Sequence, residues 1–245
     1  MHVEYINHYL TDKDVANFAR QSFGKLAENF TEVQNNNLIK FLARGMSSGG
    51  WESLITQMCT VKSSDEAKEL ATYLRKIPEH YVPYCHPHIT LRMKAPVPIA
   101  RQLFKHKIGF SESEESRRYV SHKPEYYVPD FFRSAAANVK QGSGDKHHNN
   151  DFWLKHYKQH CIDAIGMYEQ MIIDGVCPEQ ARFILPQGTE VNWVLTGSLY
   201  AFANLYNQRS DSHAQKEIQD VAHMVDGIIS PLYPVSWQAL TKGVY

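Results

Sequence analysis

The strictest constraint on the fold comes from one short segment, His88–Lys94, in which apolar and polar residues alternate without a break. Ile89, Leu91 and Met93 are apolar, and the residues between them are polar or charged. Side chains alternate between the two faces of an extended chain, so this pattern predicts a β-strand with one buried face. Such a strand must pack that face against other elements.

Most of the remaining chain has helical periodicity. The longest helical pattern covers residues 151–174, where apolar residues recur every three or four positions. Shorter helices are predicted at residues 14–26, 38–45, 64–77, 98–109, 178–185, 198–208 and 213–229, the last begun by a Ser212/Gln215 capping box. A short strand is predicted at 191–195, a flexible break at 46–50, a polar loop at 111–118 and a mobile loop at 134–150. No internal repeat or linker divides the chain, which indicates a single domain over residues 1–245.

The composition excludes several classes of protein. Lysine and arginine number 26 and aspartate and glutamate number 26, so the formal net charge is zero and a general nucleic-acid coat is disfavoured. Hydrophobic residues make up 43% and charged residues 21%, which is typical of a packed domain. No apolar run reaches the roughly 18 residues of a spanning helix, and no secretory signal is evident at the start. We therefore expect a cytoplasmic protein, in the host cytoplasm if the source is viral, with no membrane partner.

The cysteines and histidines leave a metal site open. Four cysteines are present, and no two of them form a CxxC pair, which favours reduced thiols. A zinc site would have to combine Cys85 with His80, His86 and His88. The last two histidines alternate at the entry to a strand and would point the same way without a metal. The favoured interpretation is a set of small buried thiols and a His-rich turn, with no metal.

The densest group of chemically active side chains lies in residues 101–119. On a helix, Arg101 and Lys105 lie four residues apart, as do Gln102 and His106, so cationic and polar side chains form adjacent rows. A polar loop of serines and glutamates follows and ends in two arginines. Serine, arginine and lysine beside a flexible turn suit phosphate binding. A solvated amphipathic helix with a charged loop would give the same pattern.

Two more arginines follow downstream. Arg182 lies in a short apolar helix, where an unpaired charge is costly, so we expect it to reach a partner anion. Arg209 precedes the capped helix, and its alternative role is an ion pair with Asp211. His213 falls in the first turn of that helix, where the dipole favours a neutral imidazole. No GxGxxG, GxxxxGK[ST] or GxSxG motif is present, which disfavours Rossmann, P-loop and hydrolase sites.

Four segments between residues 80 and 220 carry recognisable motifs. They are HYVPYCHPHITLRMKAPVPIARQ, then Lys105-His106-Lys107 with Ser116 and Arg118-Tyr119, then ARFILP, and finally RSDSHAQKEIQ. In this order and approximate spacing they resemble the flavin-dependent thymidylate synthases, most of all the phage-type members. The signature of that family is Arg-His-Arg, seven residues and Ser, usually continuing into Arg-Tyr; here the spacer has eight residues.

The resemblance implies a reaction and a fold. The reaction is the reductive methylation of dUMP to dTMP, with methylenetetrahydrofolate as carbon donor and NADPH as reductant through bound FAD. The fold is α+β, with a central mixed or antiparallel sheet flanked by helices. The family forms homotetramers with active sites built from several subunits. Dispersed cations suit such phosphate-bearing ligands without a single phosphate loop.

The resemblance also implies roles for single residues. The expected catalytic group is Arg209, which would polarise the uracil ring. The implied dUMP-binding residues are Gln102, Lys105, Glu114, Ser116, Arg117, Arg118, Arg182 and Arg209. The implied FAD-binding residues are Lys105, His106, Lys107, Glu114, Ser198, Tyr200, Asn204 and His213, with His80 near the stack of flavin and folate.

Departures from the family pattern leave two alternatives open. Lys105 and Lys107 replace arginines and keep the charge without the bidentate fork. Ser198 and Tyr200 stand where an Asn and an Arg are common. These flavin-side differences motivate a deoxyuridylate hydroxymethylase, used for DNA modification, on the same scaffold. A non-catalytic nucleotide or nucleic-acid binder is the more distant alternative, and the zero net charge and the acidic SESEE turn weigh against it.

Overall fold

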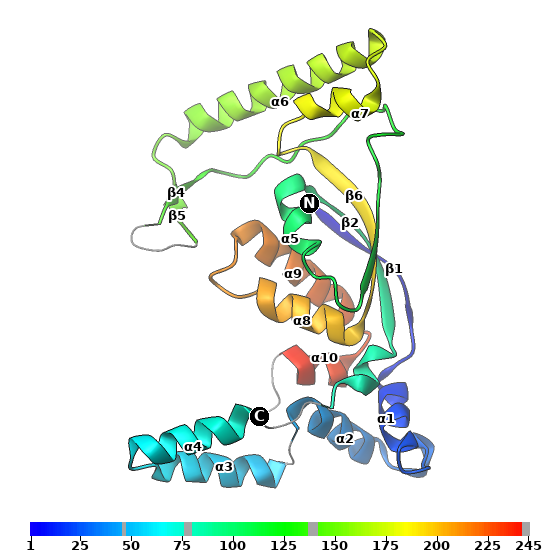
Figure 1. Ribbon diagram of the computed structural model, residues 1–245, viewed down its shortest axis with the longest axis vertical. Helices are drawn as coiled ribbons and strands as arrows, with labels where there is room; N and C mark the ends of the chain where they lie inside the picture. Colours follow the sequence, from blue (N-terminus) through cyan, green and yellow to red (C-terminus); the bar gives the residue numbers. More distant parts are fainter. Residues whose placement is uncertain (46–47, 76–79, 137–141, 242–245) are drawn as a thin grey trace. The chain divides into compact units, whose positions relative to one another are not determined.

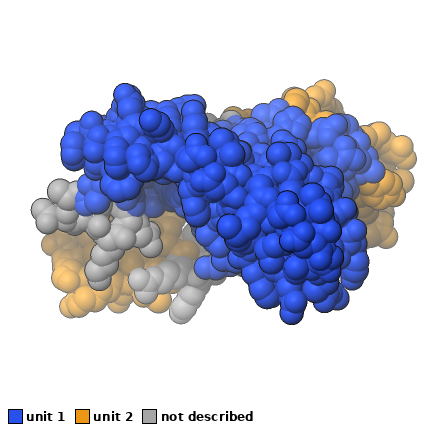
Figure 2. Space-filling model, turned by 90° about the horizontal axis from the view of Figure 1, so that it is seen from above, with its two compact units in different colours: residues 1–7, 89–197, 204–228 blue, residues 8–88, 198–203, 229–245 orange. Residues whose placement is uncertain are grey.

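The computed structural model describes residues 1–45, 48–75, 80–136 and 142–241. The chain divides into two compact units, each assembled from segments that are far apart in the sequence (Figures 1 and 2). Unit 1 comprises residues 1–7, 89–197 and 204–228, and unit 2 comprises residues 8–88, 198–203 and 229–245. Helices and a β-sheet together confirm the predicted α+β class. The single domain over the whole chain stays a prediction.

The sheet lies mainly in unit 1 and has the strand order β1-β2-β6-β3. Its strands are β1 (His2–Tyr9), β2 (His88–Pro96), β6 (Glu190–Ser198) and β3 (Phe110–Glu114). β2 contains the alternating segment, and Ile89, Leu91 and Met93 are all buried, as predicted. Burial of one face of this strand is what binds the sheet to the core of the unit.

β3 includes residues 111–114 of the predicted polar loop, so the prediction is wrong for these four residues, whereas residues 115–118 form a loop as predicted. The strand pairs antiparallel with β6 and places Phe110 opposite Gly197. A Cβ atom at Gly197 would lie 2.3 Å from the Phe110 ring, so glycine permits this close approach. β3 lies at the edge of the sheet, where its serines and glutamates are half-buried or exposed and no apolar alternation is needed.

Helices and a two-stranded ladder complete unit 1. The helical elements are α5 (Val97–Leu103), α6 (Asn150–Ile173), α7 (Pro178–Ala181), η3 (Arg182–Ile184), α9 (Lys216–Ile229) and the second half of α8 (Leu199–Arg209). In Figure 1, α7 lies beside α6, which it contacts. β4 (Arg133–Ala135) pairs antiparallel with β5 (Ser143–Lys146). β5 and most of β4 lie inside the predicted loop 134–150, of which residues 137–141 lie outside the described residues.

Two predicted helices of unit 1 have different bounds. The helix predicted over 98–109 ends at Leu103, so Lys105 and His106 lie beyond it in a turn. The helix predicted from residue 213 begins at Lys216, so the Ser212/Gln215 capping box does not form. Both differences move predicted site residues from helices into turns.

Unit 2 is helical. Its elements are α1 (Asp12–Gln21), η1 (Ala27–Asn29), α2 (Glu32–Arg44), α3 (Ser48–Thr60), α4 (Ser64–Arg75), η2 (Val82–Cys85), the first half of α8 and α10 (Pro234–Thr241). α2 packs against α1 and α10, and Trp237 is buried there. Gly45 ends α2 with φ +69°, in the left-handed conformation that favours glycine. The predicted break at 46–50 is wrong for residues 48–50, which begin α3; residues 46 and 47 lie outside the described residues.

Candidate active site

The short helix α5 positions two groups of functional side chains in unit 1. Pro98 suits its first turn, because proline is preset for that position. Val97, Ala100 and Arg101 all line a cavity, and Arg101 lies four residues, about one helical turn, after Val97. Gln102 does not line this cavity and bonds instead to Gln215 before α9. The helix thus separates a cavity on one face from a polar cluster around Gln102.

The cavity has a volume of about 720 Å³ and is rich in guanidinium groups. It is lined by α5, by residues 114–117 and by residues 182–191, and its cations are Arg101, Arg117 and Arg182. Their hydrogen-bond acceptors are uncharged: Arg101 donates to the Gln187 side chain at 3.4 Å, and Arg182 Nε donates to the Glu179 carbonyl at 3.2 Å. The lining also contains the carboxylates of Glu114 and Glu115. Arg117 donates to the carbonyl of His122.

Among the described residues, none of these three arginines forms an ion pair with a carboxylate. Apolar side chains, including Phe104 and Leu185, supply the rest of the lining. Three guanidinium groups beside an apolar wall make a strong receptor for a phosphate, because charge-assisted hydrogen bonds of arginine match its oxygens. The cavity is therefore suited to an anionic ligand that also has a flat apolar part.

Predicted site residues also line this cavity. Partial burial raises the pKa of Glu114, and the positive charge of Arg182 opposes that rise. Ser116 Oγ accepts the backbone N–H of Arg118 at 3.3 Å and so holds the turn after β3. The cavity thereby brings together four of the predicted dUMP residues, namely Glu114, Ser116, Arg117 and Arg182.

Arg118 is placed elsewhere. Its guanidinium forms an ion pair with Glu179 at 2.6 Å and lies over the Tyr119 ring. It does not line the cavity. Lys105 is exposed in the turn after α5 and has no ion-pair partner among the described residues.

Arg209, the predicted catalytic residue, lies at the end of α8 and is half-buried. Its Nε donates to His106 Nε2 at 2.8 Å, and its Nη2 donates to the Gln102 carbonyl at 3.1 Å. The alternative pair with Asp211 does not form, since Asp211 accepts from His213 instead. Both partners of Arg209 are neutral, and its Nη1 has no partner among the described residues. The guanidinium can therefore donate to a further acceptor without breaking these bonds.

His106 depends electrostatically on this contact. Burial lowers its pKa, and the positive charge of Arg209 lowers the pKa further. Burial also lowers the pKa of Arg209. A neutral His106 is the form that can accept a hydrogen bond at Nε2, so its charge state and the placement of Arg209 are coupled.

The predicted flavin residues are divided between the two units. His80, Ser198 and Tyr200 belong to unit 2, and the others belong to unit 1. Ser198 is buried, and its Oγ accepts the N–H of Ala201, so its hydroxyl stabilises the first turn of α8. Tyr200 stacks on Tyr81 with ring centroids 5.0 Å apart.

The other predicted flavin residues differ in their exposure and in their contacts. His80 is exposed and stacks on Phe41. Lys107 forms an ion pair with Glu112, and Asn204 is exposed. His213 is exposed in the turn before α9, so its predicted place in the first turn of the helix is wrong.

The sequence places Arg101 in a cationic row, and the family resemblance assigns it no role in the site. Its helical spacing from Val97 and Phe104 was the signal that could have placed it, because these positions share one face of a helix. Thr189, also on the cavity wall, is buried, and its hydroxyl has no hydrogen-bond partner among the described residues. No sequence pattern identified it.

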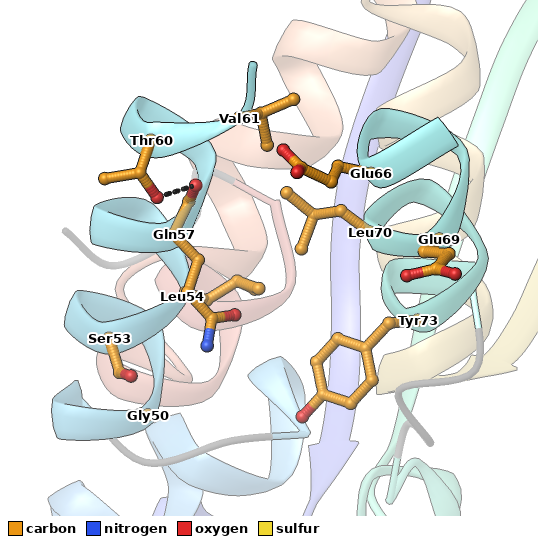
Figure 3. Close-up of a pocket in the computed structure, with 10 residues that line it drawn as sticks. All are labelled: Gly50, Ser53, Leu54, Gln57, Thr60, Val61, Glu66, Glu69, Leu70 and Tyr73. Carbon is orange, nitrogen blue, oxygen red and sulfur yellow. Dashed lines mark hydrogen bonds between the residues drawn. The ribbon is translucent and has the colours of Figure 1, made fainter. Parts of the chain in front are cut away.

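A second cavity contains no predicted site residue. It has a volume of about 750 Å³ and lies between α3 and α4 in unit 2, with Glu66, Leu70 and Tyr73 pointing toward α3 (Figure 3).

Within the described ranges, no group of three or more His, Cys, Asp or Glu side chains could hold a metal, and the four cysteines form no disulfide. Cys161 is buried as predicted, but Cys59 and Cys177 are exposed, so the prediction of buried thiols is wrong for these two. In the same ranges, no helix is both long and apolar enough to cross a bilayer.

Comparison with known proteins assigns the family. The family described as thymidylate synthase complementing protein matches residues 6–235 of this chain. The chain belongs to this family. The flavin-dependent thymidylate synthases of Thermosipho africanus and Thermosipho melanesiensis are each 32% identical to it, over 187 and 190 residues. Each alignment covers 76% of this chain and 81% of the relative.

A solved structure agrees with the fold. The UMP/dUMP methylase PolB from Streptomyces cacaoi, bound with 5-Br dUMP, matches this family member with a TM-score of 0.77 and 23% sequence identity. The match covers 97% of this chain and 93% of that chain. The predicted membership in the flavin-dependent thymidylate synthase family is confirmed, and the protein is an enzyme of the methyltransferase class.

Proposed function

We propose that the protein converts dUMP to dTMP by reductive methylation at carbon 5 of the uracil. Methylenetetrahydrofolate would supply the carbon, and NADPH would supply the reducing equivalents through bound FAD. The observation that carries this proposal is the cavity of Arg101, Arg117 and Arg182, three guanidinium groups that form no ion pair with a carboxylate in the described chain. A nucleoside monophosphate has the dianion and the flat base that such a cavity suits.

Arg209 would act on the uracil ring. Its Nη1 is available, and the bonds from Nε to His106 and from Nη2 to Gln102 fix the plane of the guanidinium. A cation fixed beside a uracil carbonyl or ring nitrogen stabilises negative charge on the ring and lowers the pKa of that nitrogen. Negative charge on the ring raises the nucleophilicity of carbon 5, which is the atom to be methylated.

The donor set fits FAD at its pyrophosphate. Lys105 and Lys107 are exposed cations in the turn after α5, and Lys105 has no ion-pair partner in the described ranges. His213 and Asn204 are exposed polar groups of the same unit. We expect these residues to hold the cofactor, which supplies hydride transfer when bound. Ser198 would act indirectly, since its hydroxyl already accepts the Ala201 N–H.

The division of the dUMP residues supports an active site shared between subunits of a homotetramer. Arg182 and Ser116 line the cavity beside α5. Gln102 does not line this cavity, and its carbonyl accepts a hydrogen bond from Arg209. A single nucleotide would need both sets. One copy would then supply the phosphate cavity and another copy the Arg209 cluster.

The absorbance spectrum of the purified protein tests the proposal. We expect a yellow protein with flavin bands and oxidation of NADPH that depends on added dUMP. A colourless protein that fails to take up added FAD would overturn the proposal.

Replacing Ser116 with alanine should preserve part of the activity. The hydroxyl holds a turn and lines the cavity, so its loss removes about one neutral hydrogen bond and lowers kcat/KM by roughly fivefold. Steady-state kinetics with varied dUMP measure this. Complete loss of turnover with intact nucleotide binding would contradict a binding role, because it would indicate a nucleophile.

The rate should fall in acid through His106. The pKa of His106 lies below the usual value of about 6.5, so at neutral pH the ring accepts the bond from Arg209. As pH drops through that lowered pKa, the ring becomes a cation facing a cation, and kcat decreases. A His106→Gln variant keeps an acceptor that does not titrate, so we expect its kcat not to show this decrease at low pH, which we call the acid limb of the pH profile. The control, His156→Gln on the exposed side of α6, should keep it. An unchanged acid limb in His106→Gln would refute the assignment.

A further inference from the structure

Arg209 belongs to a chain of hydrogen-bonded residues that ends at an ion pair. Gln102, whose carbonyl accepts from Arg209, donates its side-chain amide to Gln215 Oε1 at 2.8 Å. Gln215 in turn donates to Glu217 Oε2 at 2.9 Å. Both carboxylate oxygens of Glu217 accept from Arg133 Nη2 at 2.8 Å. The chain of bonds therefore joins α8, α5, the start of α9 and β4.

Glu217 is the buried residue of this chain, whereas Gln215 is exposed. The side chains of Arg133 and Glu217 are 23% and 10% exposed. Burial raises the pKa of Glu217, but the hydrogen bonds from Arg133, the backbone and Gln215 outweigh it and leave the pKa below its usual value. A pair whose carboxylate is buried gains little net stability, because desolvation offsets the attraction. Its ionised carboxylate can only accept hydrogen bonds, and this fixes the direction of the chain.

The direction matters because each glutamine amide has a donor end and an acceptor end. Glu217 requires the NH₂ group of Gln215, so the Gln215 oxygen faces Gln102 and accepts from it. Gln102 is thereby tied through its side chain to the start of α9. Its carbonyl is one of the last four of α5, which lack partners inside the helix, and so it is available to Arg209.

We propose that Glu217 and Arg133 are positioning residues that orient Arg209 through Gln215 and Gln102. The proposal rests on the proposed function, in which Arg209 acts on the uracil. In this arrangement the charge of Glu217 sets the orientation of both amides, and the amides hold the C-terminal end of α5 where its carbonyl meets the guanidinium. Arg133 holds the carboxylate, and its Nε bond to Ser143 at 2.6 Å ties β4 to β5.

Two variants of the holoenzyme test the inference. Gln215→Leu interrupts the chain and leaves the buried ion pair intact, whereas Glu217→Gln removes the charge that sets its direction. We expect each to lower kcat by about fivefold or more, the effect of losing one hydrogen bond, with the KM for methylenetetrahydrofolate unchanged. We also expect Arg133→Lys to retain more activity than Arg133→Met, because lysine keeps the charge beside Glu217.

A second readout does not depend on activity. Arg209 contributes to the lowered pKa of His106, so displacement of its guanidinium should raise the pKa of His106 toward the ordinary value. NMR titration of the histidine ring protons, with His106→Gln used for assignment, measures this change in Gln215→Leu and Glu217→Gln. The matched control is Glu190→Gln, since Glu190 is 10% exposed and pairs with Lys94 and the N-terminus outside the chain of bonds. It should leave both readouts unchanged.

The outcomes separate this inference from the proposed function. If the wild-type enzyme does not act on dUMP, the proposed function fails, and the His106 titration still decides whether Arg209 is held through Gln215. If Gln215→Leu keeps wild-type kcat and the wild-type His106 titration, the positioning role is wrong and the proposed function stands. If Glu217→Gln fails to fold, Gln215→Leu carries the test alone.

Discussion

Replacing Arg209 with alanine should lower kcat by about a hundredfold to a thousandfold while FAD stays bound. The guanidinium is half-buried, bonds to two neutral acceptors and has Nη1 free of partners among the described residues. Loss of one preorganised donor to a developing negative charge has effects of about this size. Single-turnover kinetics measure the chemical step, and the flavin absorbance of the purified variant measures cofactor retention.

The control for this substitution is Arg92→Ala. Arg92 lies on β2 in the same unit, is exposed and forms a surface ion pair with Glu4, so its loss should leave kcat near the wild-type value. Arg209→Lys should recover only part of the rate, because lysine keeps the charge and loses the planar fork that bonds His106 and Gln102. A near-normal rate in Arg209→Ala would contradict the uracil-activating role.

Replacing Arg182 with alanine should raise the KM for dUMP by about tenfold to a hundredfold with a smaller effect on kcat. Arg182 lines the cavity with Arg101 and Arg117, and a charged hydrogen bond of this kind contributes about 1.5 to 3 kcal/mol. The wild-type KM should also rise with salt, because salt screens exposed charges. Steady-state kinetics at two ionic strengths measure both effects, and an unchanged KM in the variant would exclude the cavity as the phosphate site.

The same two substitutions test the shared active site. When Arg182→Ala and Arg209→Ala chains are co-expressed with different tags and purified together, some sites combine an intact cavity from one copy with an intact Arg209 cluster from another. Such a mixture should recover part of the wild-type activity. No recovery in a purified mixed oligomer would indicate that each copy builds its site alone.

Local patterns predicted the elements whose own residues determine them. β2 follows from the alternation of Ile89, Leu91 and Met93, and α6 follows from its apolar spacing. In both cases burial of one face favours the secondary structure, and the spacing of the apolar residues in the sequence identifies that face. Gly45 likewise ends α2 through its own backbone freedom.

Long-range contacts determined what local patterns could not predict. β3 is a strand because its backbone pairs with β6, although its residues are serines and glutamates. Arg209, at the end of α8, donates a hydrogen bond to His106 and so holds the turn after α5. Gln215, expected in a capping box with Ser212, instead bonds Gln102 and Glu217. Except for Gln215 and Glu217, these partners lie far apart in the sequence, so no short window of sequence contains them.

The sequence predicts which residues belong to the candidate site. It does not predict which of them lie together. Family motifs identified Ser116, Arg182 and Arg209, which lie on separate elements. Their placement on different faces of α5 depends on how that helix packs, and Arg101 joins the cavity for the same reason. Arg133 carried no sequence signal, because its role depends on an ion pair with Glu217 from α9.

The most direct test is the mass of the nucleotide product. Purified enzyme loaded with FAD is incubated with dUMP, NADPH and methylenetetrahydrofolate, and the product is analysed by mass spectrometry. The account predicts conversion of dUMP to a product with the mass of dTMP. A product with the mass of 5-hydroxymethyl-dUMP would instead assign the hydroxymethylase activity, and the absence of any conversion by the flavin-loaded enzyme would contradict the account.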